Sequence, residues 1–167
     1  MRTVAVIPAR YESSRLRGKP LADICGRPMI WWVHHQIAKS QKIAAVYVAT
    51  DHEEVRRACE EYGIAAIMTF SGHRSSTERI YEAAKSIPAD VYVCVNGDEH
   101  LIEPGIVERV IPKEGEPFFA SNLMTRIRRP VEAVDDTNIK VVTDREGNAL
   151  FMSRSPIPHP KARVDYE

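Results

Sequence analysis

The sequence has 167 residues, of which 44% are hydrophobic and 28% are charged, so it is long enough for one compact domain and too apolar for a disordered chain. Lys plus Arg equals Asp plus Glu at 23 each, which leaves a formal net charge of zero. Proteins that bind nucleic acid usually carry a basic excess, so the composition argues against a nucleic-acid partner.

Strand and helix signals alternate along the first part of the chain. Short runs rich in β-branched and small apolar residues predict strands at 4–7, 45–49, 65–68 and 91–95. A helix signal follows each run, and these signals begin at Pro28, at Asp51 as an N-cap, at Ser75 with Glu78 as a capping box, and at Pro104. Strands that alternate with helices pair in parallel through right-handed crossovers, so we expect an α/β fold.

The pattern changes in the last third of the chain. Residues 118–123, 139–143 and 149–153 predict further strands, and the turn sequence at 144–147 joins the last two into a hairpin. The tail from Ser155 onward is rich in proline and is expected to be extended. We find no internal repeat and no linker, and we expect a single domain over residues 1–167.

The three cysteines, Cys25, Cys59 and Cys94, form no CxxC pair and no spacing typical of a zinc site. This favours small, reduced and buried side chains over a redox or metal role. The apolar start of the chain is too short for a signal peptide, and no stretch is long enough to span a bilayer. We therefore expect a cytoplasmic protein without a membrane partner.

Ligands of open parallel sheets bind at the carboxyl edge of the strands, so the residues that follow each predicted strand are the candidate site. The loop after the first strand carries Arg10, Arg15 and Lys19, which could clamp a triphosphate and stabilise departing pyrophosphate. The loop after the fourth strand carries Asp98 beside Glu99. A carboxylate next to phosphates suits Mg²⁺, which also lowers the pKa of an attacking hydroxyl.

Each of these features also has a purely structural interpretation, and those interpretations stay open. Cations in a loop are often a solvated surface, an Asp-Glu pair is often a turn, and Ser75 with Glu78 suits a capping role. Two common nucleotide motifs are absent, because Pro20 follows Gly18-Lys19 where a P-loop needs Ser or Thr, and no GxGxxG follows the first strand. The sequence therefore disfavours ATPases and dehydrogenases.

At these same loops the sequence resembles the 3-deoxy-manno-octulosonate (KDO) cytidylyltransferase family, the CMP-KDO synthetases. The shared motifs run in order along the chain as IPARY at 7–11, SRLRGKPL at 14–21, GRPMI at 26–30, VATDH at 48–52, HRSSTER at 73–79, VNGDE at 95–99, NIKVV at 138–142 and ALFMSRSPIP at 149–158. Several nucleotidyltransferases share the opening motif, whereas the ordered set is specific to this family. The resemblance implies a three-layer α/β/α nucleotidyltransferase fold with a mostly parallel central sheet, and a homodimer.

The resemblance also implies a reaction, in which the anomeric hydroxyl of KDO attacks the α-phosphorus of CTP in the presence of Mg²⁺. The products would be CMP-KDO and pyrophosphate, in the pathway to bacterial lipopolysaccharide. It implies catalytic roles for Lys19, Arg10 and Asp98, with Asp98 as the magnesium ligand. The nucleotide-binding residues that it implies are Pro8, Ala9, Arg10, Arg15, Lys19, His73, Ser75, Asn96, Gly97 and Asp98.

The chain departs from the family pattern at Arg17, Ser76, Asn96 and His100, where the family usually has Pro, Gly, Gln and Pro. Family members also continue well beyond Glu167, so we expect this chain to lack the family's C-terminal part. That part would complete the sugar pocket and the dimer surface, and would supply a second magnesium carboxylate.

Three alternatives remain. The acceptor could be another acidic sugar or a phosphonate, which the changes at Ser76, Asn96 and His100 motivate. A glycosyltransferase of related fold would hold a nucleotide-sugar through Asp98 and Glu99, although a diphosphate needs fewer cations than this loop carries. A truncated, non-catalytic relative would bind CTP without releasing pyrophosphate.

Overall fold

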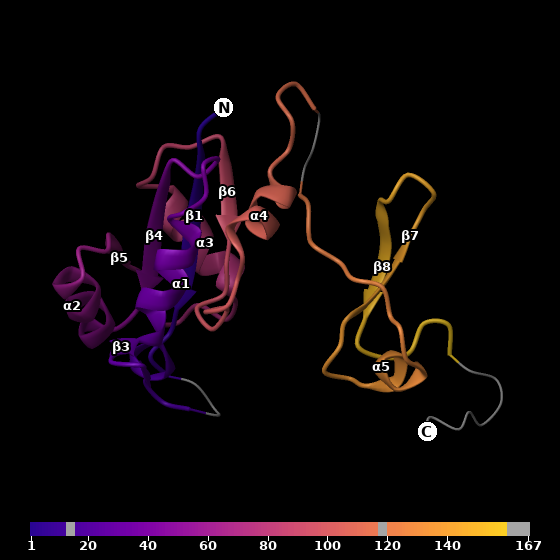
Figure 1. Ribbon diagram of the computed structural model, residues 1–167, viewed down its shortest axis with the longest axis horizontal. Coiled ribbons are helices and arrows are strands. Elements are labelled where there is room, and N and C mark those ends of the chain that lie inside the picture. Colours follow the sequence, from indigo (N-terminus) through magenta and orange to yellow (C-terminus); the bar gives the residue numbers. More distant parts are fainter. Residues whose placement is uncertain (13–15, 117–119, 160–167) are drawn as a thin grey trace. The chain divides into compact units, whose positions relative to one another are not determined.

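The computed structural model describes residues 1–12, 16–116 and 120–159. The chain divides into two compact units, Met1–Ser121 and Asn122–Glu167, which are described one at a time (Figure 1). The single domain expected over residues 1–167 stays a prediction.

A four-stranded parallel sheet forms the centre of the first unit. Its strands are β1 (Thr3–Ala9), β4 (Ala45–Thr50), β5 (Ala66–Met68) and β6 (Val91–Cys94). They lie in the order β5-β4-β1-β6, and each neighbouring pair is parallel. The four strands predicted from apolar runs are confirmed in place and in orientation.

Helices follow the strands as predicted. They are α1 (Met29–Ile37), α2 (Glu53–Glu61), α3 (Ser76–Ala84) and α4 (Pro104–Val107), with the 3-10 turn η2 (Glu108–Val110) directly after α4. Ser75 caps α3, since its Oγ accepts a hydrogen bond from the Glu78 amide at 3.2 Å. The Glu78 carboxylate accepts from the Arg74 amide at 2.7 Å, one residue earlier than a standard capping box.

The predicted N-cap of α2 is wrong by one residue. His52 takes that position, and its Nδ1 accepts a hydrogen bond from the Glu54 amide at 3.3 Å. Asp51 is not available as a cap, because its carboxylate oxygens are bound by Arg79 and by the Tyr11 amide.

Side chains of β1 alternate between two cores, as they must in a strand that is covered on both faces. Ala5, Ile7 and Ala9 enter one core together with apolar residues of α1, α2 and α4. Val4 and Val6 enter the other core, which the apolar face of α3 completes. The sheet therefore lies between helices on both faces (Figure 1), which confirms the three-layer α/β/α fold.

Three short elements between β1 and α1 were not predicted. They are η1 (Lys19–Leu21), β2 (Asp23–Ile24) and β3 (Arg27–Pro28), the last two forming an antiparallel pair. Cys59 is buried as expected, whereas Cys25 and Cys94 are exposed, so the expectation of buried cysteines is wrong for these two.

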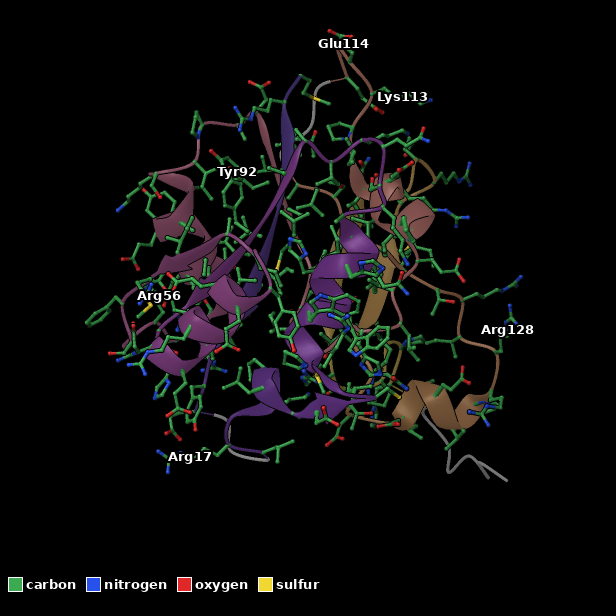
Figure 2. All side chains as sticks on the ribbon, turned by 60° about the vertical axis from the view of Figure 1, so that its left-hand side comes forward. Arg17, Arg56, Tyr92, Lys113, Glu114 and Arg128 are labelled. Atoms are coloured by element: carbon green, nitrogen blue, oxygen red, sulfur yellow. The ribbon has the colours of Figure 1, made fainter. Side chains whose placement is uncertain are left out.

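The surface of the first unit carries charged side chains at its loops. Arg17, Lys113 and Glu114 point outward and are exposed (Figure 2). Among residues 1–12, 16–116 and 120–159, no helix combines the length and the apolar character needed to cross a bilayer.

The second unit contains the predicted hairpin of β7 (Lys140–Thr143) and β8 (Ala149–Ser153), which pair antiparallel. A short helix that was not predicted, α5 (Pro130–Val134), begins at a proline in its first position. The strand predicted at 118–123 is wrong for residues 120–123, which have no strand partner in the described chain, and its first two residues lie outside the description. The described part of the proline-rich tail, residues 155–159, forms no helix or strand.

Candidate functional site

A cavity of about 290 Å³ lies at the carboxyl edge of the sheet, where the neighbouring strands β1 and β6 end. The segment after β1, the first turn of α3 and the segment after β6 form its walls. Of the residues predicted for the site, those on the cavity wall are Pro8, Ala9, Arg10, Lys19, Asn96, Gly97 and Asp98. These residues were predicted from the sequence because they follow the strand ends, where ligands of parallel sheets bind, and the structure brings them together around one cavity.

An ion pair joins two sides of the cavity. Lys19 Nζ lies 2.6 Å from Asp98 Oδ2, and both side chains are partly exposed, at 32% and 45%. A cation that is held over a carboxylate in a polar cavity is positioned for anionic and metal-bound ligands alike. Two of the three residues predicted to be catalytic, Lys19 and Asp98, therefore lie in direct contact.

The position of Lys19 depends on a tight turn before it. Gly18 has a φ of +66°, a conformation that favours glycine, and its amide donates to the Tyr11 carbonyl oxygen at 2.8 Å. A Cβ at Gly18 would also lie 3.4 Å from the Tyr11 ring. This turn folds the segment after β1 back on itself and begins η1 at Lys19.

A second turn presents Asp98. The Glu99 amide donates to the Asn96 carbonyl oxygen at 3.1 Å, and Asn96 Nδ2 donates to Glu99 Oε1 at 2.8 Å. A Cβ at Gly97 would lie only 3.1 Å from the Pro8 carbonyl oxygen. Glycine at this position therefore allows the segment after β6 to approach the end of β1 closely.

Two of the predicted site residues that the structure describes, His73 and Ser75, are not on the cavity wall. Arg15 lies outside the described residues. Ser75 caps α3, and His73 Nε2 contacts the Glu82 carboxylate, which also accepts from the Phe70 amide at 2.9 Å. Nucleotide-binding roles for Arg15, His73 and Ser75 stay predictions.

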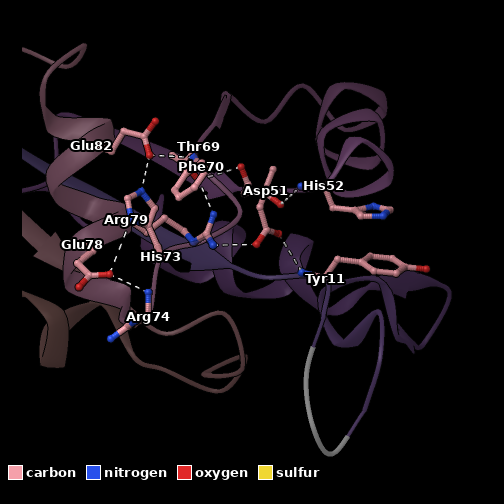
Figure 3. Close-up of polar contacts among 11 residues, drawn as sticks. Tyr11, Asp51, His52, Thr69, Phe70, His73, Arg74, Glu78, Arg79 and Glu82 are labelled. Carbon is pink, nitrogen blue, oxygen red and sulfur yellow. Dashed lines mark hydrogen bonds and ion pairs between the residues drawn. The ribbon is translucent and has the colours of Figure 1, made fainter.

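The cavity wall also includes four residues that were not predicted as site residues, namely Glu12, Pro20, Ser76 and Arg79. Arg79 is fully buried and bonds to Asp51, which follows β4 (Figure 3). The sequence offered one signal that Arg79 belongs to the site. Arg79 lies in the first turn of α3, beyond the end of β5, and that turn faces the sheet edge that carries the cavity.

Within the described residues, no three His, Cys, Asp or Glu side chains are grouped so that they could hold a metal ion by themselves. Asp98 and Glu12 are the acidic residues on the cavity wall. A cation here would therefore need further ligands, such as the oxygens of a phosphorylated molecule.

A parallel sheet with cations and a carboxylate at its carboxyl edge is typical of α/β proteins that bind phosphorylated ligands. The model of a protein family described as cytidylyltransferase matches residues 4–166. This chain therefore belongs to the cytidylyltransferase family.

The names of similar proteins agree with the resemblance found in the motifs. The chain is 42% identical over 161 residues to the 3-deoxy-manno-octulosonate cytidylyltransferase of Geotalea uraniireducens, covering 95% of this chain and 64% of that protein. It is 40% identical over 161 residues to the enzyme of the same name from Escherichia coli, covering 96% and 65%. The chain thus spans somewhat less than two thirds of the length of these relatives.

Solved structures give the same result. A structure of CMP:2-keto-3-deoxy-manno-octonic acid synthetase complexed with CTP matches with a TM-score of 0.81 and 36% identity, over 96% of this chain and 67% of that one. A cytidylyltransferase from Leptospira borgpetersenii matches with a TM-score of 0.59 at 23% identity, over 66% of this chain and 47% of that one, which supports the fold alone.

Proposed function

We propose that this protein binds CTP in the cavity beyond β1 and β6 and transfers its cytidylyl group to the anomeric hydroxyl of KDO. The observation that carries the proposal is the pairing of Lys19 with Asp98 on the cavity wall, 2.6 Å apart. The names of the relatives supply the nucleotide and the acceptor.

In this proposal the segment after β1 binds the phosphates. Arg10 and Lys19 line the cavity and offset the charge of a triphosphate, and Arg15 would add a third cation. Pro8 and Ala9, at the end of β1, would form the pocket for the base, together with the loop that contains His73 and Ser75. Asn96 and Gly97 would contact the nucleotide from the opposite wall.

The reaction requires positioning and charge stabilisation more than covalent help from the protein. The anomeric oxygen forms a bond to the α-phosphorus, and the bond from that phosphorus to the oxygen bridging to the β-phosphate breaks. The electron pair leaves with pyrophosphate, and the hydroxyl proton goes to solvent. Lys19 and Arg10 stabilise the negative charge that develops on pyrophosphate.

The acidic side chains fit a magnesium ion that is shared with the nucleotide. Mg²⁺ is commonly held by one or two carboxylates plus phosphate oxygens, and Asp98 supplies one carboxylate on the cavity wall. When bound, the ion would neutralise phosphate charge and make the attacking hydroxyl more acidic. Lys19, which otherwise neutralises Asp98, would then be available for the phosphates.

The remaining expectations about cell biology belong to the same proposal. The reaction would take place in the cytoplasm and would provide CMP-KDO for lipopolysaccharide synthesis. The protein would act without nucleic acid or membrane partners, and a homodimer of the family type is the expected assembly.

The test is to incubate the 167-residue chain with CTP, Mg²⁺ and KDO and to follow the release of pyrophosphate. Release that requires all three supports the proposal. Parallel reactions with a neuraminate-like sugar acid and with a phosphonate test the acceptor, and a clear preference for either of them would overturn KDO. CTP binding without pyrophosphate release from any acceptor would favour a non-catalytic relative.

A further inference from the structure

Arg79 is a buried guanidinium that lies beside the cavity instead of pointing into solvent. Its side chain is 0% exposed, and Nη2 donates to Asp51 Oδ2 at 2.8 Å (Figure 3). Nη1 donates to Thr69 Oγ1. Burying a guanidinium destabilises a protein unless the charge is paired, and the Asp51 side chain, itself only 12% exposed, provides that pairing.

The contact with Asp51 connects Arg79 to the segment after β1. Asp51 Oδ1 accepts a hydrogen bond from the Tyr11 amide at 3.3 Å, as Figure 3 shows. The Tyr11 carbonyl oxygen in turn accepts from the Gly18 amide at 2.8 Å. A continuous series of contacts therefore runs from Arg79 to the residues that directly follow Arg10 and directly precede Lys19.

The Tyr11 side chain is fixed on the same side. Its ring stacks on His52 with 3.7 Å between centroids and 11° between planes. Its hydroxyl donates to Glu54 Oε2 at 3.2 Å. Backbone and side chain of Tyr11 are thus both attached to the region that follows β4, where Arg79 holds Asp51.

Arg79 also joins the ends of two strands. Thr69 follows β5, and both its amide and its Oγ1 donate to the Thr50 carbonyl oxygen, at 2.8 and 3.0 Å. Since Thr50 ends β4, the guanidinium ties α3, β4 and the residue after β5 together at the sheet edge that carries the cavity.

This arrangement is not optimal for stability. Arg79 Nε is buried and has no hydrogen-bond partner among the described residues. An unpaired buried donor destabilises the folded state, and apolar residues of similar volume often replace buried ion pairs with no loss of stability. Residues that break such packing rules tend to lie at functional sites.

We propose that Arg79 is a positioning residue for nucleotide binding: through Asp51 and the Tyr11 amide it holds the segment that carries Arg10 and Lys19 in its binding conformation. The inference rests on the proposed function, because the nucleotide is the ligand that this segment would bind. Arg79 acts through other residues and needs no contact with the substrate.

The experiment compares Arg79→Met, Arg79→Lys and Asp51→Asn in the full chain, with Arg57→Met as the matched control. Arg57 is also on a helix, but its side chain is 68% exposed, and its one ion pair among the described residues is with Glu53, at 3.5 Å. Two quantities are measured: the affinity for CTP with Mg²⁺, and the rate of hydrogen exchange of the Tyr11 amide without ligand. Thermal unfolding establishes that each variant is folded at the temperature used.

We expect Arg79→Met to weaken CTP binding about ten- to hundredfold and to speed Tyr11 amide exchange, while Arg57→Met changes neither. Arg79→Lys keeps the charge but lacks the planar guanidinium whose two Nη atoms donate to Thr69 and Asp51, so an intermediate loss is expected. A folded Arg79→Met protein with wild-type CTP affinity and wild-type Tyr11 exchange would overturn the proposal. If Arg79→Met does not fold, Asp51→Asn tests the proposal in its place. Wild-type CTP affinity and wild-type Tyr11 exchange in a folded Asp51→Asn protein would then overturn it.

The two readouts separate this inference from the proposed function. A wild-type chain that does not bind CTP would contradict the proposed function. In that case faster Tyr11 exchange in Arg79→Met and Asp51→Asn still supports the positioning role, and unchanged exchange still overturns it.

Discussion

The Nζ of Lys19 lies 2.6 Å from Oδ2 of Asp98, which links the segment after β1 to the segment after β6 across the cavity. Both side chains are partly exposed, at 32% and 45%, and ion pairs with this exposure contribute only about 0–1 kcal/mol to stability. The pair is therefore better explained by the ligand that the cavity binds than by the stability of the fold.

Replacement of Lys19 by alanine should abolish most of the turnover and leave the fold intact. Loss of a group that stabilises developing charge reduces kcat by about 100- to 1,000-fold. The measurements are pyrophosphate release and thermal unfolding. Lys39→Ala is the control, because Lys39 is exposed and contacts only Gln36 by its Nζ among the described hydrogen bonds. Near-normal turnover in Lys19→Ala would remove Lys19 from the mechanism.

The Asp98→Asn variant should need far more Mg²⁺ to bind CTP, since it loses the carboxylate that would hold the ion. The matched variant is Glu99→Gln, which retains an oxygen for the hydrogen bond from Asn96 Nδ2. Titration of Mg²⁺ at fixed CTP, and removal of Mg²⁺ by a chelator, check this expectation. Equal magnesium dependence in wild type and Asp98→Asn would assign the ion to other ligands.

Substitution of Gly97 by alanine should destabilise the fold by about 1–2 kcal/mol and weaken CTP binding, because the new Cβ would lie 3.1 Å from the Pro8 carbonyl oxygen. Gly105→Ala is the control. Gly105 lies in α4 with nothing within 4 Å of a Cβ, so alanine there should leave stability unchanged or raise it by up to about 1 kcal/mol. Urea unfolding of both variants compares the two positions, and equal effects would refute the close approach of Gly97 to β1.

The Glu82 carboxylate should stabilise the loop before α3 in a pH-dependent way. Two contacts lower the pKa of Glu82 below its ordinary value of 4.5. The hydrogen bond from the Phe70 amide has the larger effect, and the contact with His73 has the smaller one. Because the pKa is lower in the folded protein, the contribution of Glu82 to the free energy of unfolding is fully present above pH 4.5. This contribution is lost as the pH falls through the pKa that Glu82 has in the folded protein.

Urea unfolding of wild type and Glu82→Gln between about pH 3 and pH 7 tests this sign. The difference in unfolding free energy should be constant above the ordinary value of 4.5 and should shrink at lower pH. A difference that grows as the pH falls would contradict the assigned contacts.

Much of the sheet could be predicted because its strands are short apolar runs between polar loops, as in Val4 to Ile7. The apolar spacing of Ile30, Val33 and Ile37 likewise predicts α1, which buries these residues. The N-cap of α2 could not be predicted, since the Asp51 carboxylate is taken by Arg79, 28 residues further along the chain. Local patterns do not report contacts of this length.

The candidate site was predictable as far as topology alone brings residues together. Lys19 and Asp98 follow two strands that are neighbours in the sheet, so the strand-end rule placed them in one cavity. Arg79 was missed because a charged residue in a helix pattern is expected to face solvent. Its burial becomes visible only when Asp51 and Thr69 are placed around it.

The cavity beyond β1 and β6 is expected to bind CTP through the segment that carries Lys19. Calorimetric titration of the chain with CTP in the presence of Mg²⁺ tests it most directly, with GTP as the competing nucleotide and Lys19→Ala as the matched variant. We expect saturable binding of CTP to the wild-type chain, weaker binding of GTP, and a large loss of CTP affinity in Lys19→Ala. Absence of saturable CTP binding, or equal affinity of the wild type and Lys19→Ala for CTP, would contradict it.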